Sequence, residues 1–428
     1  MYEFHPYFTN DGSVGLYNSD YNDIYHSAKG ALTEAYEKFI LPVDFDKLMS
    51  KPEIKVLDIC YGIGYNSKSF LNYVFENYCK KNFLKNSILI NRNIEAIYTN
   101  NIFKHQDNNS HTHNSNYNDT IDTNNIIPRI SITAVDNDKI LALLSPFIQT
   151  GVRNFKNDNL DFHYNLEKYF TAQSHMSSNK ISDLINFLIF EKLLENTSEL
   201  LENDELNSIL KNNKYKSYFN SKLKGIYEFN KRKVNKCAGT SDKPTILHNI
   251  YYKYVSECYK NGLKRYNLQE INFYLKIDDA RKVILENNEL FNLIFLDAFT
   301  PSKCPCLWSY EFFIELYKHL SDDGLLLTYS TSASIRGAML EAGFQIGNIY
   351  NQRENKFTGT IAVKDKNLIK YPLSEFDLGL IKTRAGIFYR DKNLTRLNEA
   401  IIEERNLEVK NSSRITSSQY KKSYKESL

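Results

Sequence analysis

Short apolar runs that end at an aspartate recur along this chain, and they constrain its fold more than any other feature. The clearest is NLIFLDAF, in which apolar residues lead into Asp297 and a loop stiffened by Pro301 and Pro305 follows. Such a run is typical of a strand buried on both faces, and proline does not continue a strand. Because ligands of open α/β sheets bind beyond the carboxyl ends of the strands, we expect Asp297 to be placed for chemistry; a helix cap or a solvated loop acid is the alternative.

Similar runs occur at three earlier places: IKVLDI, which contains Asp58, RISITAV, which leads into Asp136, and INFYLKI, which leads into Asp278 and Asp279. After Asp297, the helix-like segments SYEFFIELYKHL and SIRGAMLEAGF flank an apolar run in SDDGLLLTYS, and FQIGNIYNQ with FTGTIAVKD is a predicted antiparallel pair. The alternation predicts a mostly parallel, doubly wound α/β sheet with an antiparallel terminal hairpin. This order of elements resembles that of the class I, Rossmann-like methyltransferase fold.

A glycine bend, CYGIGYN, follows the first of these runs and leads into a helix-like segment. Gly62 and Gly64 let the backbone pass close to a ligand, and the first amides of the helix would face that ligand. We count Asp58, which lies at the end of the preceding strand, with the candidate cofactor-binding residues. Only two of the three glycines of a dinucleotide fingerprint are present, so binding of a nicotinamide or a flavin is not expected.

Acids also follow the second and third runs. Asp136 stands where an acid that accepts hydrogen bonds from a ribose is expected, and a turn-forming Asp-Asn-Asp triplet is the alternative. A carboxylate at the third strand end, Asp278 or Asp279, can accept a hydrogen bond from the exocyclic amine of an adenine. Together with the glycine bend, these acids predict a ligand site at one edge of the sheet.

The 428 residues divide into a folded core and two long insertions. We predict an N-terminal hairpin and helix in residues 1–50, a core in residues 51–368 and a tail in residues 369–428. The first insertion, at about residues 80–128, is Asn-rich and cannot bury enough apolar surface to order itself. The second, at about residues 152–269, interleaves lysines with tyrosines, which fits RNA contact; a solvated basic helix face is the alternative.

Composition and the N-terminal sequence narrow the classes of function. A net charge of +3 is too small to identify a nucleic-acid-binding protein. The six cysteines are scattered, which suits reduced thiols, and no second Cys or His pair accompanies Cys304 and Cys306 at zinc-site spacing, so no metal is expected. The N-terminus lacks the features of a signal peptide, and no apolar stretch is long enough to span a membrane, so we expect a cytoplasmic protein.

Several segments, in this order along the chain, carry a resemblance to a known family: VLDICYGIGYN, SITAVDND, FYLKIDDAR, FLDAFTPSKCPCLW, TYSTSASIRGAMLEAGF, KTRAGIFYRD and SSQYKK. They resemble the methyltransferase module of the tRNA wobble-uridine modification enzyme MnmC, in particular its stand-alone, MnmD-like members. The resemblance implies transfer of a methyl group from S-adenosylmethionine to the exocyclic amine of 5-aminomethyluridine, commonly 2-thiolated, at the tRNA wobble position. Larger family members add a flavin-dependent oxidase domain, for which we expect no counterpart, and hence no FAD, after Phe344.

Matched residue by residue, the resemblance implies roles for individual side chains. The glycine bend would hold the amino-acid end of the cofactor, and acids would bind its ribose and adenine. The implied cofactor residues are Glu34, Gly62, Gly64, Asn66, Asp136 and Asp279. Asp297 matches the active-site aspartate, which would accept a hydrogen bond from the substrate amine. The chain departs from the family at Cys60, Cys304 and Phe388, where a glycine, an asparagine and a proline are usual.

Candidate contacts with the anticodon stem-loop of tRNA are basic or aromatic. We expect phosphate contacts from Lys303, Arg336, Arg384 and Arg390. Trp308, the only tryptophan, is expected either to wall the base pocket or to anchor its loop in the core. Two rival functions stay open: a polyamine-synthase-like aminopropyltransferase, which shares the fold, and a non-catalytic RNA-binding protein.

Overall fold

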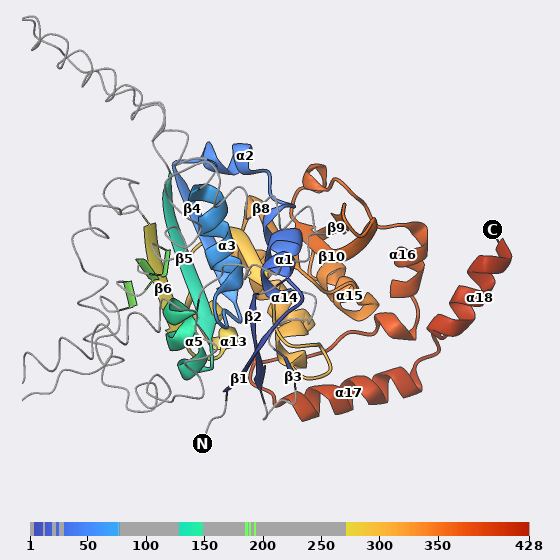
Figure 1. The fold of residues 1–428 in the computed structure, drawn as a ribbon. Helices are drawn as coiled ribbons and strands as arrows, with labels where there is room; N and C mark the ends of the chain where they lie inside the picture. Colours follow the sequence, from blue (N-terminus) through green and yellow to red (C-terminus); the bar gives the residue numbers. More distant parts are fainter. Residues whose placement is uncertain are drawn as a thin grey trace, which may run out of the picture.

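A seven-stranded sheet lies at the centre of the protein (Figure 1). The computed structural model describes residues 4–11, 13–18, 23–24, 30–75, 77, 128–148 and 271–427, with residues 185–186, 188–189 and 192–193. The sheet order is β6-β5-β4-β7-β8-β10-β9. Its strands are β4 (Glu53–Ile59), β5 (Arg129–Asp136), β6 (Ile271–Ile277), β7 (Phe291–Leu296), β8 (Leu320–Thr328), β9 (Gln345–Asn351) and β10 (Lys356–Val363).

The pairing confirms the predicted fold class. The β4 strand is parallel to both β5 and β7, β5 is parallel to β6, and β7 is parallel to β8. The β10 strand is antiparallel to β8 and to β9, which gives the expected terminal hairpin. Because successive strands are added on one side of β4 and then on the other, the strand order reverses beside β4, and this is where ligands of doubly wound sheets bind.

Helices cover both faces of the sheet, because its central strands are apolar on both sides. In β7, Leu293 and Phe295 pack into one hydrophobic cluster, whereas Ile294 and Leu296 pack into the other. The first cluster includes residues of α1 (Ala31–Ala35), α3 (Tyr65–Val74) and α5 (Lys139–Leu144). The second includes residues of α13 (Ala280–Glu286), α14 (Tyr310–His319) and α15 (Ala333–Glu341). The run that ends at Asp297 is thus the doubly buried strand that its sequence predicts.

The N-terminal segment forms a small antiparallel sheet and a helical part. The sheet contains β1 (Phe4–Phe8), β2 (Val14–Asn18) and β3 (Asp23–Ile24), and the helical part contains α1, the π-helical turn η1 (Tyr36–Ile40) and α2 (Phe45–Met49). A buried carboxylate joins the two parts, because Asp11 Oδ2 accepts hydrogen bonds from the Thr33 amide at 2.9 Å and the Thr33 hydroxyl at 2.8 Å. This contact fixes the helix that carries Glu34.

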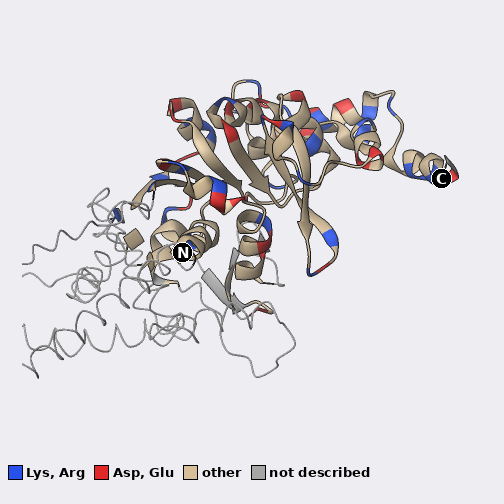
Figure 2. Cartoon of the chain, turned by 90° about the horizontal axis from the view of Figure 1, so that it is seen from above, with Lys and Arg blue, Asp and Glu red and all other residues tan. Residues whose placement is uncertain are grey.

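The C-terminal part consists of η8 (Lys366–Leu368), α16 (Glu375–Ile381), η9 (Arg384–Gly386), α17 (Asn398–Asn411) and α18 (Ser417–Ser427). The α17 helix packs against η7 (Pro305–Trp308), and α18 packs against α16. Basic and acidic residues are interspersed along the described parts of the chain (Figure 2). Among the described helices, none is long and apolar enough to cross a membrane.

The two predicted insertions lie outside the described residues, apart from residue 128 and the short helical pieces between residues 185 and 193. The RNA contact considered for the second insertion therefore falls there too. The division of the chain at residues 50 and 368 stays a prediction.

Candidate active site

A cavity of about 740 Å³ lies beyond the carboxyl ends of β4, β5, β6 and β7. Its lining comes from α1, the glycine bend and the loops that follow the other three strands. The predicted site residues in this lining are Glu34, Gly62, Asn66, Asp136, Asp279, Asp297 and Lys303. Segments far apart in the sequence thus meet at the edge of the sheet where the pattern of acids predicts a ligand site.

The glycine bend adopts left-handed backbone conformations at three positions. Gly62 has φ 56° and Gly64, the N-cap of α3, has φ 85°. A side chain at Gly64 would collide with the ring of Tyr61. Cys60, which stands where the family usually has glycine, also has a positive φ, 62°. An L-residue adopts this conformation at a cost of about 1 kcal/mol, so Cys60 adds backbone strain to the bend.

Asp136 is held by backbone amides beside this bend. Its Oδ2 accepts a hydrogen bond from the Gly62 amide at 2.7 Å, and its Oδ1 accepts one from the Asp138 amide at 2.8 Å. Burial raises the pKa of Asp136 to about 6, although both amides oppose the shift. A carboxylate has room for about four hydrogen bonds, so the oxygens that face the cavity retain acceptor capacity for hydroxyl groups.

Asp297 lies across the cavity from Asp136, at the end of β7. Its Oδ2 accepts a hydrogen bond from Asn66 Nδ2 at 3.0 Å. Burial raises the pKa of Asp297 to about 6; the Asn66 bond opposes the shift, and the negative charge of Glu34 adds to it. Glu34 in turn pairs with Lys38 at 2.8 Å. The cavity therefore contains a carboxylate that is ionised at neutral pH and titrates just below it.

Asp58 lies beneath the cavity and does not line it. The side chain is fully buried, and its Oδ2 accepts hydrogen bonds from the amide of Ser67 at 3.1 Å and from the Ser67 hydroxyl at 2.5 Å. Burial raises the pKa of Asp58 to about 8 despite the Ser67 bonds, and the charges of Asp297 and Asp136 contribute. The structure thus gives Asp58 a part in fastening α3 to β4, which differs from the expected direct contact with a cofactor.

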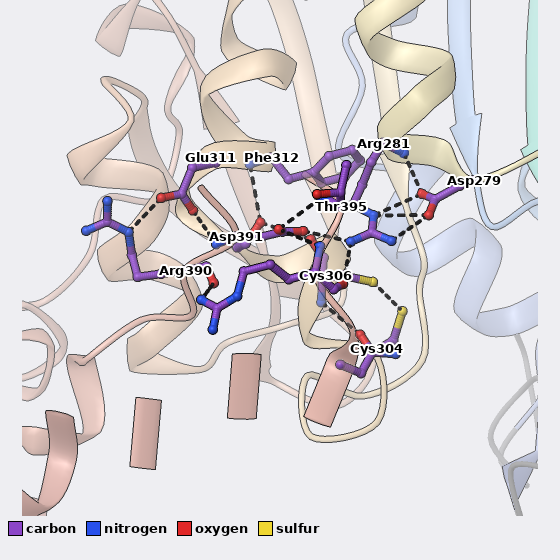
Figure 3. Close-up of polar contacts among 12 residues, drawn as sticks. Asp279, Arg281, Cys304, Cys306, Glu311, Phe312, Arg390, Asp391 and Thr395 are labelled. Atoms are coloured by element: carbon purple, nitrogen blue, oxygen red, sulfur yellow. Dashed lines mark hydrogen bonds and ion pairs between the residues drawn. The ribbon is translucent and has the colours of Figure 1, made fainter. Parts of the chain in front are cut away.

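Asp279 belongs to a charged network that joins the cavity to the C-terminal segment (Figure 3). The Arg281 guanidinium contacts Asp279 Oδ2 at 2.6 Å through Nη2 and Asp391 Oδ2 at 2.7 Å through Nη1. Asp391 is fully buried, and its other oxygen accepts hydrogen bonds from the amides of Thr395 and Arg396, both at 3.1 Å. Arg281 therefore sets the position of Asp279 and ties this wall of the cavity to residues more than a hundred positions later.

Three thiols, those of Cys60, Cys304 and Cys306, also line the cavity. The sulfur atoms of Cys304 and Cys306 are 3.7 Å apart (Figure 3). The hydrogen bond with Cys304 and the charge of Arg281 hold the pKa of Cys306 below its ordinary value, although burial opposes them. The Cys306 amide donates to Asn398 Oδ1 at 3.3 Å, which brings the start of α17 into the wall. Within the described ranges, no group of three or more His, Cys, Asp or Glu side chains could hold a metal ion.

The remaining predicted residues lie away from the cavity. Trp308 is fully buried and donates from Nε1 to the Phe299 carbonyl at 2.8 Å, so it anchors the loop in the core, one of its two expected roles. Arg336 is only 4% exposed and donates to Thr360 Oγ1 at 2.9 Å and to Asn348 Oδ1 at 2.6 Å. The expectation that Arg336 contacts a phosphate needs correction, because its guanidinium is bound inside the fold.

The two arginines of the tail hold neighbouring segments together. Arg384 donates to the carbonyls of Arg414 at 2.9 Å and Ser412 at 3.0 Å, which joins η9 to the turn before α18. Arg390 donates from Nε to Glu311 Oε1 at 2.7 Å (Figure 3). Its guanidinium lies over the ring of Tyr310. Neither Arg384 nor Arg390 lines the cavity, so either one would contact a bound RNA only outside the cavity.

Other lining residues were not predicted from the sequence. Lys38 is one helical turn after Glu34, and this i, i+4 spacing of opposite charges was a signal that could have found it. Tyr329, Arg281 and Asn398 carried no comparable signal. Tyr329 donates from its hydroxyl to the Ala298 carbonyl at 2.9 Å, and its ring lies 5.5 Å from Lys38 Nζ, so it closes the cavity beside Asp297.

Parts of the chain are similar to known methyltransferases. Residues 243–364 match a family described as S-adenosyl-L-methionine-dependent methyltransferase. The Uncharacterized protein MJ0670 of Methanocaldococcus jannaschii is 32% identical over 171 residues, which are 38% of this chain and 48% of that protein. The tRNA 5-methylaminomethyl-2-thiouridine biosynthesis bifunctional protein MnmC of Burkholderia vietnamiensis is 34% identical over 70 residues, 16% of this chain and 11% of that protein. The same-named protein of Pseudomonas entomophila is 30% identical over 110 residues, 24% of this chain and 17% of that protein.

The match thus spans about half of the archaeal protein and less than a fifth of each bacterial one. Among solved structures, the crystal structure of MnmC2 from Aquifex aeolicus superposes with a TM-score of 0.51 and 18% identity, covering 96% of this chain and 87% of that one. At that identity the likeness shows the fold. The methyltransferase family match, the MnmC relatives and the shared fold together support an MnmC-like methyltransferase module in this chain.

Proposed function

We propose that the protein methylates the exocyclic amine of 5-aminomethyl-(2-thio)uridine at the wobble position of tRNA, with S-adenosylmethionine as methyl donor. The observation that carries this proposal is the position of Asp297: an acid that is ionised at neutral pH faces the same cavity as the glycine bend and Asp136. The MnmC relatives are named for the biosynthesis of 5-methylaminomethyl-2-thiouridine in tRNA, the product that this methylation would give, and a tRNA substrate would place the protein in the cytoplasm.

The residues present fit the cofactor. Gly62 exposes backbone to the cavity, Asp136 retains acceptor capacity for ribose hydroxyls, and Asp279 is held by Arg281 where an adenine amine could donate to it. When bound, S-adenosylmethionine supplies an activated methyl group on a sulfonium. The protein must then mainly align a neutral amine with that group and keep it in place.

Asp297 would do this by accepting a hydrogen bond from the substrate amine. Asn66 occupies one side of the carboxylate, so the carboxylate is oriented before the substrate arrives. An ammonium group has no lone pair with which to attack, and a carboxylate with a pKa of about 6 can take up its proton and pass it to water. Lys303 also lines the cavity, and its ammonium could contact an RNA phosphate.

The proposal is tested by identifying the methylated product. The purified protein would be incubated with labelled S-adenosylmethionine and tRNA from cells unable to complete wobble aminomethyl modification, and the nucleosides then separated. We expect the label in 5-methylaminomethyl-(2-thio)uridine. Label in another nucleoside would contradict the proposed substrate, and aminopropyl transfer from decarboxylated S-adenosylmethionine would point to the polyamine-synthase rival. RNA binding without any cofactor binding in calorimetry would point to a non-catalytic protein.

A further inference from the structure

A second cavity, of about 570 Å³, adjoins the candidate active site. The two cavities share Glu34 and Lys38, which line both of them. The rest of the second lining comes from Asn10, from Thr33 in α1, from η1, from Thr331 after β8 and from the hairpin of β9 and β10. Asn351 Nδ2 donates to Glu37 Oε2 at 2.6 Å, so the hairpin is fixed against the helical segment that separates the cavities. The ion pair of Glu34 and Lys38 thus lies between the two cavities and contributes to the wall of each.

An aromatic platform forms the outer rim of this second cavity. Phe357 is 48% exposed although it is a large apolar side chain. Its ring centroid lies 5.7 Å from that of Tyr350 and 6.0 Å from that of Tyr371, and the two tyrosine rings lie 5.3 Å apart. The Lys370 ammonium lies 5.3 Å from the Tyr371 ring. The tyrosines therefore support the back of Phe357, while its other side is available for stacking.

The polar groups of the cavity suit a phosphate and a base edge. Two of its acids form ion pairs, Glu34 with Lys38 at 2.8 Å and Glu354 with Lys356 at 2.5 Å, and Glu37 accepts a hydrogen bond from Asn351. Arg353 is exposed at the hairpin turn. Thr358 Oγ1 is buried and has no hydrogen-bond partner among the described residues, although a buried hydroxyl normally has one. A guanidinium and a spare hydroxyl beside an exposed ring are groups that recognise a nucleotide.

We propose that this second cavity binds the nucleotide next to the one that is methylated, with its base on Phe357 and its phosphate at Arg353. The inference rests on the proposed function, because it requires an RNA substrate whose reactive base enters the first cavity. A base that enters an active site leaves the stack of its neighbours. Single-stranded RNA loops are recognised by stacking such bases on aromatic side chains. In the second cavity, Phe357 offers this stacking partner to the flanking nucleotide, and Glu34 and Lys38 lie between this cavity and the first.

The test compares Phe357→Ala and Arg353→Gln with the wild type on two substrates: an anticodon stem-loop RNA and the free 5-aminomethyluridine nucleoside. We expect KM for the stem-loop to rise about tenfold in each variant, in line with the loss of one base-aromatic stack or one phosphate contact. The kcat, the affinity for S-adenosylmethionine and the rate with the nucleoside should not change, because none of these uses the second cavity. Phe357→Tyr keeps a ring and should restore the wild-type KM.

Lys318→Gln is the matched control, since Lys318 is an exposed cation on α14 that pairs with Glu315 and lines neither cavity. An unchanged KM for the stem-loop in both Phe357→Ala and Arg353→Gln would overturn the inference. Absence of methyl transfer by the wild type would overturn the proposed function alone. In that case the affinity for the stem-loop, measured by fluorescence anisotropy, still decides: weaker binding by both variants supports the subsite, and equal binding removes it.

Discussion

Asn66 Nδ2 donates a hydrogen bond to Asp297 Oδ2 across 3.0 Å, and this contact joins the first turn of α3 to the end of β7. One element follows the glycine bend, and the other contributes the candidate catalytic acid, so the bond sets the acid relative to the bend. Because the Asn66 amide occupies Oδ2 of this carboxylate, Oδ1 is the oxygen that can accept a hydrogen bond from the substrate. The arrangement of the site can be tested residue by residue.

Substitution of Asp297, the candidate catalytic residue, should separate methyl transfer from cofactor binding. We expect Asp297→Ala to abolish methylation of aminomethyluridine tRNA, because the substrate amine loses its hydrogen-bond acceptor. The affinity for S-adenosylmethionine, measured by calorimetry, should stay within about tenfold, a loss below roughly 1.4 kcal/mol. Asp297→Asn retains the size of the side chain without its charge and should be equally inactive. Retained turnover in either variant would remove Asp297 from its assigned role.

Methyl transfer should depend on pH through Asp297. Its pKa is raised to about 6, so below that pH the group is protonated and cannot accept the proton of the amine. We expect kcat at saturating S-adenosylmethionine to rise as the pH increases through about 6. Saturation matters because Asp136 also has a pKa of about 6, and its titration would change cofactor affinity instead. A flat profile between pH 5 and about 7 would contradict this role for Asp297.

Asp58 should make the folded protein less stable as the pH rises. Its folded-state pKa is about 8, whereas an unfolded aspartate titrates near pH 4, so between these values the folded state binds more protons. The contribution of this group is therefore complete below about pH 4 and is lost as the pH increases towards 8. Urea titrations at several pH values would give the slope of the free energy of unfolding against pH. We expect Asp58→Asn to make this slope less negative, by up to about 1.4 kcal/mol per pH unit. The same slope in both proteins would argue against a protonated Asp58.

Arg281 should matter for both stability and cofactor affinity. Removing its guanidinium leaves Asp391 buried without its cation, so Arg281→Met should lower the free energy of unfolding by about 3 kcal/mol or more and weaken S-adenosylmethionine binding. Arg281→Met combined with Asp391→Asn removes both charges and should recover part of the stability. Lys282→Met, on the same helix, breaks only an exposed pair with Asp278 and should lower the free energy of unfolding far less. Equal losses in Arg281→Met and Lys282→Met would show that the buried network is unimportant.

The fold was predictable because a strand buried on both faces must be apolar along its whole length. The apolar run of β7 meets this requirement, and the order of such runs and helix-like segments gives the order of the elements. The positions of the glycine bend and Asp136 at strand ends were predicted from the same runs. The environment of a long polar side chain was not predictable. Arg336 was expected at an RNA phosphate, but β9 and β10 surround it with Asn348 and Thr360. Asp58 lies beneath the cavity because Ser67, at the start of α3, covers it.

The sequence by itself determined the sheet, its helices and the edge at which acids gather, since these depend on residues near one another in the chain. Only the tertiary structure decided which groups share the cavity. The link from Asp279 through Arg281 to Asp391, the wall made by Asn398, and the second compartment behind Glu34 and Lys38 each bring together segments separated by long stretches of chain. Such contacts depend on how the elements pack in three dimensions, and local patterning of apolar and polar residues does not encode them.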